Sequence, residues 1–226
     1  EAARVERNSN NTPETITIEV PGTRCRQSEA GVSPRIVVLG DSHGEHLFAG
    51  ILLDKPEVPS AYVYLEDWPS IISSDSQGVV RQIAASTSIE SVLVSARWNE
   101  VNVQSAQLPE TLSELIAAGK RVVVLDDVPY FDFHAMECEY ARFIGPKSQC
   151  TMPRSEFDTF RESYVLELAD VVEASRAEFM TAGSTFCTSE ECSMVRDGVL
   201  QYADNGHLNI EGSRSFIEAL TRGGVF

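Results

Sequence analysis

Short apolar runs, each followed by a segment with helical spacing, constrain the fold of this chain more than any other feature of its sequence. The runs cover residues 35–39, 60–65, 91–96 and 121–125. Runs of this kind that alternate with helices predict a parallel sheet that is covered on both faces. Because crossover connections between parallel strands are right-handed, we expect an α/β fold, a three-layer α/β/α sandwich with a flavodoxin-like sheet.

The spacing of apolar residues between and after these runs places the helices. It predicts helices over residues 43–53, 79–85, 109–118, 155–180 and 210–220. Ser155 is the expected N-cap of the longest helix. Residues 130–153 are expected to form a long loop, and residues 184–187 a short strand.

The first 33 residues are polar and irregular, unlike the rest of the chain. Only residues 15–20 alternate between apolar and polar side chains, as a lone edge strand does. We therefore predict an extension over residues 1–33 that packs on a domain formed by residues 34–226. Because the chain begins at Glu1 and not at a methionine, we expect it to be an excised segment of a longer protein.

The charge of the chain excludes several classes of partner. Its formal net charge is −16 and its pI is about 4.6. Such a surface repels phosphate backbones and anionic lipid headgroups, so we predict no nucleic-acid partner and no peripheral contact with anionic lipid. No apolar run approaches the ~18–20 residues that a membrane-spanning helix needs.

The five cysteines favour an oxidising compartment. Cys138 and Cys150 lie close together in the sequence, as do Cys187 and Cys192, whereas Cys25 stands apart. The preferred arrangement is two local disulfides with Cys25 left over. Five unpaired thiols in a cytosolic protein remain the alternative, because sequence alone does not fix connectivity.

The first apolar run ends in Gly40-Asp41-Ser42-His43, which has the pattern of a strand, a tight turn and a helix start. Ser42 would lie at the carboxyl edge of the sheet, where α/β folds bind their ligands. The first N–H groups of the following helix would be free to stabilise an oxyanion. In the alternative interpretation, Asp41 or Ser42 only caps that helix.

A serine nucleophile needs a histidine base, and four histidines are available. His43 and His46 have the i, i+3 spacing of a metal pair, but no third ligand is evident, and we predict no metal site. His134 is expected at the surface.

His207 is the better candidate for the base, because it follows Asp204 by three residues in a turn that contains Gly206. Asp204 would bind the Nδ1–H of His207 and leave Nε2 facing Ser42. The alternative is a turn in which Asp204 binds local backbone and His207 is a partly buried surface residue.

The two blocks Gly40-Asp41-Ser42-His43 and Asp204-Asn205-Gly206-His207-Leu208-Asn209 resemble the first and last sequence blocks of the SGNH (GDSL-like) hydrolase superfamily. In particular, they resemble the SGNH domains fused behind membrane acyltransferases of the acyltransferase-3 family, which O-acetylate bacterial surface polysaccharides such as lipopolysaccharide O-antigen. The resemblance spans about residues 34–222. It extends to Ser95-Ala96-Arg97-Trp98, to the late cysteine pair and to Val195-Arg196-Asp197-Gly198.

This resemblance implies roles for the end blocks. Ser42 would be the nucleophile, His207 the general base and Asp204 its orienting acid, and the Ser42 N–H would be one oxyanion donor. The superfamily's second block contributes a glycine as a further donor. No glycine lies between Gly50 and Gly78 here, so that donor is missing or is replaced by an N–H in the loop 66–72.

The third block departs from the family pattern Gly-x-Asn-Asp and reads Arg97-Trp98-Asn99-Glu100. Asn99 lies at the matching offset and would donate its side-chain amide to an oxyanion, or would be an ordinary loop residue. Trp98 and Arg97 are candidates for the substrate site, and the alternative for Trp98 is a place in the core.

The resemblance implies an extracytoplasmic domain of a polysaccharide O-acyltransferase that works through an acyl ester on Ser42 without a cofactor. Its partners would be a surface-glycan acceptor, an acyl group and a membrane acyltransferase domain N-terminal to it in the same polypeptide. It would lie on the periplasmic or extracellular face of the membrane. A free-standing secreted carbohydrate esterase or deacetylase and a glycan-binding module with weak catalysis remain the alternatives.

Overall fold

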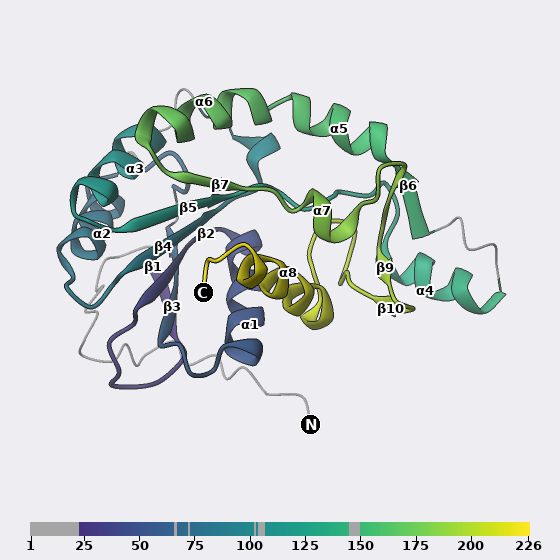
Figure 1. Ribbon diagram of the computed structural model, residues 1–226, viewed down its shortest axis with the longest axis horizontal. Coiled ribbons are helices and arrows are strands. Elements are labelled where there is room, and N and C mark those ends of the chain that lie inside the picture. The colour runs from purple at the N-terminus through teal and green to yellow at the C-terminus, as the bar shows by residue number, and fades with distance from the viewer. Residues whose placement is uncertain (1–22, 66, 72, 102, 104–106, 145–149) are drawn as a thin grey trace.

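The computed structural model describes residues 23–226 except 66, 72, 102, 104–106 and 145–149 (Figure 1). The edge strand predicted over residues 15–20 lies outside the described residues. Within this part of the chain, no helix has the length and apolar character that crossing a bilayer requires.

A six-stranded sheet forms the centre of the fold, in the order β1-β3-β2-β4-β5-β7. Its strands are β1 (Thr23–Gln27), β2 (Ile36–Gly40), β3 (Ser60–Leu65), β4 (Ser91–Ser95), β5 (Arg121–Leu125) and β7 (Glu178–Met180). The five strands from β3 to β7 are parallel, and their order is that of a flavodoxin-like sheet. The predicted fold class is therefore confirmed. The sheet also gains an antiparallel strand, because β1 pairs with β3 along all five of its residues.

Two layers of helices cover the sheet (Figure 1). On one face lie α2 (Ser74–Ala85), α3 (Leu108–Ala117) and α6 (Val165–Ser175), and on the other lie α1 (Ser42–Asp54) and α8 (Ile210–Arg222). Along each strand, the side chains of successive residues point to opposite faces of the sheet. In β2, Val37 and Leu39 pack toward the first layer and Val38 toward the second, and all three are fully buried.

Helices α1 and α8 lie side by side and approach closely (Figure 1). Gly50 of α1 faces α8 at the crossing, where an added Cβ would lie 2.7 Å from the carbonyl oxygen of Ser213 and 2.8 Å from Cγ1 of Ile217. Any larger residue at Gly50 would therefore push the two helices apart. Ser42 begins α1, and α8 begins three residues after His207, so this pair of helices positions both ends of the candidate site.

Between β5 and α8, the chain also builds a part that lies to one side of the sheet, at the right in Figure 1. It contains α4 (Ala135–Ile144), α5 (Arg154–Glu162), α7 (Gly183–Phe186), β6 (Thr151–Pro153), β8 (Glu191–Ser193), β9 (Val195–Arg196) and β10 (Val199–Leu200). Strands β6 and β8 pair in antiparallel fashion, and so do β9 and β10.

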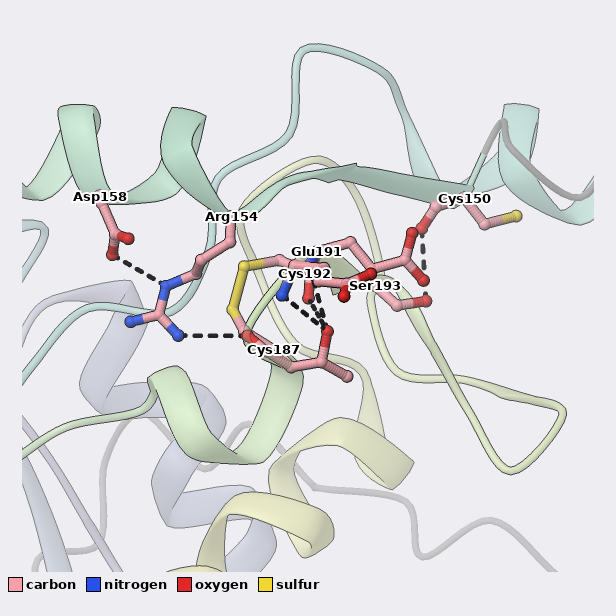
Figure 2. Close-up of a disulfide and its surroundings, with 9 residues drawn as sticks. Cys150, Arg154, Asp158, Cys187, Glu191, Cys192 and Ser193 are labelled. Carbon is pink, nitrogen blue, oxygen red and sulfur yellow. Dashed lines mark hydrogen bonds and ion pairs between the residues drawn. A yellow bond between two sulfur atoms is a disulfide. The ribbon is translucent and has the colours of Figure 1, made fainter.

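Both predicted disulfides are present in this part, Cys138–Cys150 and Cys187–Cys192, and Cys25 is free. Figure 2 shows the second disulfide beside Arg154, whose Nε lies 2.8 Å from Oδ1 of Asp158. The carbonyl of Cys150 accepts the N–H of Met194 at 2.9 Å, just beyond β8. The two disulfides thus brace the same small sheet.

Four predictions about the chain between residues 130 and 187 were wrong. The single helix over 155–180 is two helices, α5 and α6, followed by β7. Arg176 ends α6 with a left-handed backbone (φ 64°), and the chain then turns to pair β7 with β5. Helix α5 begins at Arg154 with Pro153 at the N-cap, so Ser155 is not a cap.

The loop 130–153 contains α4 and β6, and residues 184–187 form most of α7 and its C-cap, not a strand. In each case the local spacing was compatible with more than one kind of element. Tertiary contacts decided the outcome: pairing with the edge of β5 for β7, and packing in the disulfide-braced part for the others.

Candidate active site

Ser42 lies at the carboxyl end of β2, at the first position of α1, with its side chain exposed. The turn that leads to it is tight, because a Cβ at Gly40 would overlap the carbonyl oxygen of Ser95 on β4. Asp41 is the N-cap of α1, and its Oδ1 accepts the N–H of His43 at 2.8 Å. Asp41 therefore caps the helix, and the hydroxyl of Ser42 takes no part in the cap.

His207 and Asp204 lie next to Ser42. Nε2 of His207 is 2.8 Å from Oγ of Ser42, and Nδ1 of His207 is 2.8 Å from Oδ2 of Asp204. Because a carboxylate only accepts hydrogen bonds, Nδ1 carries the proton and Nε2 is left to accept the hydroxyl proton of Ser42. The side chains of Ser42, His207 and Asp204 are therefore joined by two hydrogen bonds in the order that the sequence predicts.

The backbone of the Asp204 turn holds the acid as a carboxylate. Oδ1 of Asp204 accepts the N–H groups of Gly206 at 2.8 Å and of His207 at 2.7 Å. Partial burial favours the neutral acid, but these hydrogen bonds and the imidazole of His207 outweigh it and hold the pKa of Asp204 below its usual range. Both interpretations of this turn are thus realised, since Asp204 binds local backbone and the imidazole at once.

The same turn rests on the segment that follows β5. The ring of Tyr130 packs against Gly206, where an added Cβ would lie 2.7 Å from a ring carbon. Asn205 donates its side-chain amide to the hydroxyl of Tyr130 at 2.5 Å, and its carbonyl accepts the N–H of Phe131 at 2.8 Å. These contacts hold the turn that carries His207 against the segment that follows β5.

Asp41 links Ser42 to the end of the neighbouring strand. Its Oδ2 accepts the N–H of Arg97 at 2.8 Å, just after β4, and its carbonyl accepts the hydroxyl of Tyr62 at 2.8 Å. The side chain and the carbonyl of Asp41 therefore tie the start of α1 to β3 and β4, the two strands that flank β2.

The three residues predicted from the third block, Arg97, Trp98 and Asn99, differ in how far they are exposed. Trp98 is fully buried and donates its indole N–H to the carbonyl of Leu125 at 2.7 Å. Of the two predictions for Trp98, its burial supports a place in the core and contradicts a contact with substrate. Arg97 is partly exposed, and its guanidinium lies 4.7 Å from the ring centroid of Tyr130. Asn99 is exposed in the 3-10 turn Trp98–Glu100.

Two further histidines lie beside His207. The ring centroid of His43 is 5.0 Å from that of His207 and 5.4 Å from that of His46. Nδ1 of His43 lies 2.7 Å from Oδ1 of Asp127, and both side chains are almost completely buried. Burial disfavours the protonated imidazole, but the Asp127 carboxylate outweighs it and raises the pKa of His43.

His46, unlike His43, favours the neutral imidazole. Burial, with His43 and His207 close by, lowers the pKa of His46 well below its usual range. Its Nδ1 accepts the N–H of Leu208 at 3.3 Å, so the proton of the neutral ring is on Nε2.

The other predictions about histidines concern metal and the surface. No group of three or more histidine, cysteine or acidic side chains suited to a metal ion occurs among the residues that the structure describes. His134 is exposed, and its Nδ1 accepts the N–H of Met136 at 3.1 Å at the start of α4.

A pocket of about 410 Å³ opens beside Ser42 and His207. Its other lining residues come from α1 and β1: Arg26, Glu45, His46, Phe48, Ala49 and Leu52. The arrangement can thus supply a nucleophile, a base and an adjacent space for a substrate.

Comparison with known proteins agrees with this geometry. The family model described as "SGNH domain (fused to AT3 domains)" matches residues 8–222. The chain belongs to this family. The SGNH fold is also that of the periplasmic domain of a lipopolysaccharide acetyltransferase from Salmonella ser. Paratyphi A. The two structures superpose with a TM-score of 0.63 at 16% sequence identity, over 86% of this chain and 85% of that chain. The comparison with curated proteins gave no match.

Sequence reasoning did not find every residue of this SGNH site. It missed the pairing of His43 with Asp127, because nothing local relates residues on α1 to the end of β5. It also missed Arg26, which lies in the segment predicted to be an extension. The only available signal was that Arg24 and Arg26 alternate with other residues as in a strand.

Proposed function

We propose that this SGNH domain transfers an acyl group, with acetyl the expected one, to a hydroxyl of a bacterial surface glycan. The contact of 2.8 Å between Ser42 Oγ and His207 Nε2, backed by Asp204, carries the proposal. The acyl group would reach it from a membrane acyltransferase domain in the same polypeptide. The domain would then work on the extracytoplasmic face of the membrane.

The first half of the reaction forms an acyl-enzyme. His207 takes the hydroxyl proton of Ser42 as Oγ attacks the acyl carbonyl, and the Asp204 carboxylate stabilises the imidazolium that results. The Ser42 N–H and the side-chain amide of Asn99 would donate to the oxyanion of the tetrahedral intermediate, and an N–H of the loop 66–72 would be a third donor. His207 then gives its proton to the leaving group as the ester on Ser42 forms.

The second half reverses these steps with a new nucleophile. A sugar hydroxyl gives its proton to His207 and attacks the ester carbonyl, and the proton returns to Oγ of Ser42 as the acylated sugar leaves. Water completes the same cycle as hydrolysis. Because Ser42 is exposed, water has access to the ester, and a carbohydrate esterase or deacetylase is the second candidate function.

The test compares wild type with Ser42→Ala and His207→Gln on 4-nitrophenyl acetate, with and without an O-deacetylated surface polysaccharide. We expect each variant to lose at least about a thousandfold in kcat, in line with the loss of a triad member. Acetylated polysaccharide in the wild-type reaction would support transfer, and hydrolysis with every acceptor would favour the esterase. Equal rates for wild type and Ser42→Ala would refute catalysis by this serine and leave a binding module.

A further inference from the structure

The pocket beside Ser42 is much larger than the group that the serine is proposed to carry. Its volume of about 410 Å³ lies in the range of ~300–1,000 Å³ that is typical of small-molecule sites, whereas an acetyl group has three non-hydrogen atoms. The remaining space has room for a second group, such as the acceptor or a longer acyl chain.

An ion pair in the pocket lining comes from β1 and α1. Nη1 of Arg26 lies 2.7 Å from Oε1 of Glu45, and about a third of each side chain is exposed. Arg26 faces α1 because it stands opposite Tyr62 in the register of β1 with β3, and the ring of Tyr62 stacks on Phe48. Cys25, the residue before Arg26 on β1, packs on the opposite face of the sheet, as expected for neighbouring residues of a strand. The segment before β2 therefore completes the pocket of the candidate site.

The polar groups of the pocket have hydrogen-bonding capacity left. Arginine has five N–H donors and glutamate two acceptor oxygens, so one contact between Arg26 and Glu45 does not exhaust either group. The Nδ1 of His46 accepts from the backbone, and its protonated Nε2 is the remaining donor of a ring that lines the pocket. Phe48, Ala49 and Leu52 form an apolar wall beside them.

We propose that Arg26, Glu45 and His46 bind hydroxyl groups of the acceptor sugar, with the apolar wall against its C–H face. The net charge of the Arg26 and Glu45 pair is zero, which suits an uncharged polyhydroxylated ring. An alkyl chain in this space would strip water from the ion pair without replacing its hydrogen bonds, which costs free energy. This assignment rests on the proposed function, because it takes Ser42 to be the acylated residue.

The first experiment measures binding without catalysis. Methyl glycosides of glucose, galactose, mannose and rhamnose are titrated into the Ser42→Ala domain and followed by NMR. Arg26→Met and Glu45→Gln are then added separately to Ser42→Ala. We expect the Kd of the glycoside that binds best to rise about tenfold or more in each, the size of effect given by a lost hydrogen bond to a charged group.

Arg24→Met is the matched control. Arg24 lies on the same strand, on the same face, and its guanidinium lies over Tyr64 at 4.3 Å, outside the pocket lining. This variant removes the same charge, and we expect it to bind the glycosides as the parent does. An equal loss in Arg24→Met and Arg26→Met would show a general charge effect and would overturn the proposal.

The second experiment uses the domain with Ser42 intact and measures the ratio of acetyl transfer to hydrolysis with the same glycosides. We expect this ratio of transfer to hydrolysis to fall about tenfold in Arg26→Met and in Glu45→Gln. In Arg24→Met it should equal that of the parent. Absence of glycoside binding by the parent, or unchanged binding in both variants, would refute the subsite.

Longer acyl esters separate the two possible occupants of the pocket. If 4-nitrophenyl octanoate were cleaved as fast as the acetate, and faster still by Arg26→Met, the pocket would hold an acyl chain and the proposal would be wrong. Failure of the proposed function is a separate result, since equal ester hydrolysis by wild type and Ser42→Ala would leave the binding measurements intact.

Discussion

Replacing Asp41 tests how the structure holds Ser42 in place. In Asp41→Ala, α1 loses its N-cap hydrogen bond, which costs about 0.5–2 kcal/mol. The N–H of Arg97 loses its acceptor in a partly buried position, which costs about 1–3 kcal/mol. The free energy of unfolding should therefore fall by about 1.5–5 kcal/mol. For a domain of this size, that corresponds to a drop in Tm of about 3–20 °C.

Asp41→Ser separates the two contributions. Serine is a good N-cap, so this variant keeps the bond to His43 but is too short to reach Arg97 as well. We expect about 1–3 kcal/mol of destabilisation by urea unfolding, and a lower kcat on 4-nitrophenyl acetate, because the turn that carries Asn99 is released from Ser42. If both variants unfolded within about 0.5 kcal/mol of wild type, the bridging role of Asp41 would be refuted.

Three further predictions concern groups away from the reacting atoms. Arg161→Met leaves the buried carboxylate of Asp126 without its partner at 2.6 Å, so we expect a loss of about 3–5 kcal/mol at pH 7. Since burial raises the pKa of Asp126, protonation should make this loss smaller in calorimetry near pH 4–5. Since Asp127 outweighs burial and raises the pKa of His43, this pair stabilises the fold below the unfolded pKa of about 6.5, and its contribution is lost as the pH rises through the folded pKa. Wild type should therefore lose Tm relative to His43→Gln between pH 6 and 9, and parallel curves would contradict this. Burial raises the pKa of the Cys25 thiol to about 11, so alkylation of the native domain at pH 8 without reductant should be slow. In denaturant, still without reductant, one label should be added, because Cys25 is the free cysteine of the structure. A second label would contradict the two disulfides.

The central sheet was predictable because its strands are apolar on both faces. Residues 60–65 and 121–125 match β3 and β5 without error. The prediction for β2 is shifted by one residue at each end, and that for β4 is one residue too long at its end. The end of the long helix was not predictable. Residues 178–180 continue its helical spacing, and only the open edge of β5 draws them into the sheet as β7.

The core of the candidate site was predictable for a different reason. Asp204 and His207 lie in one short turn, so their spacing predicts their contact. The contact of His207 with Ser42 was predicted only by combining this turn with the Gly40-Asp41-Ser42-His43 block and with the family resemblance. Trp98 was ambiguous because an indole serves a core and a sugar site equally well, and its burial depends on strand β5. Arg26 depends on the register of β1 with β3, which sequence spacing does not specify.

The crossing of α1 and α8 at Gly50 has a consequence for which changes of length the fold can tolerate. Ser42 and His207 are 165 residues apart in the chain, yet two helices in direct contact set the distance between their side chains. The disulfide-braced part beside the sheet lies outside this helix pair. We therefore expect a change of length in that part to leave Ser42 and His207 in contact, provided that Tyr130 and Phe131 keep their contacts with the turn that carries His207.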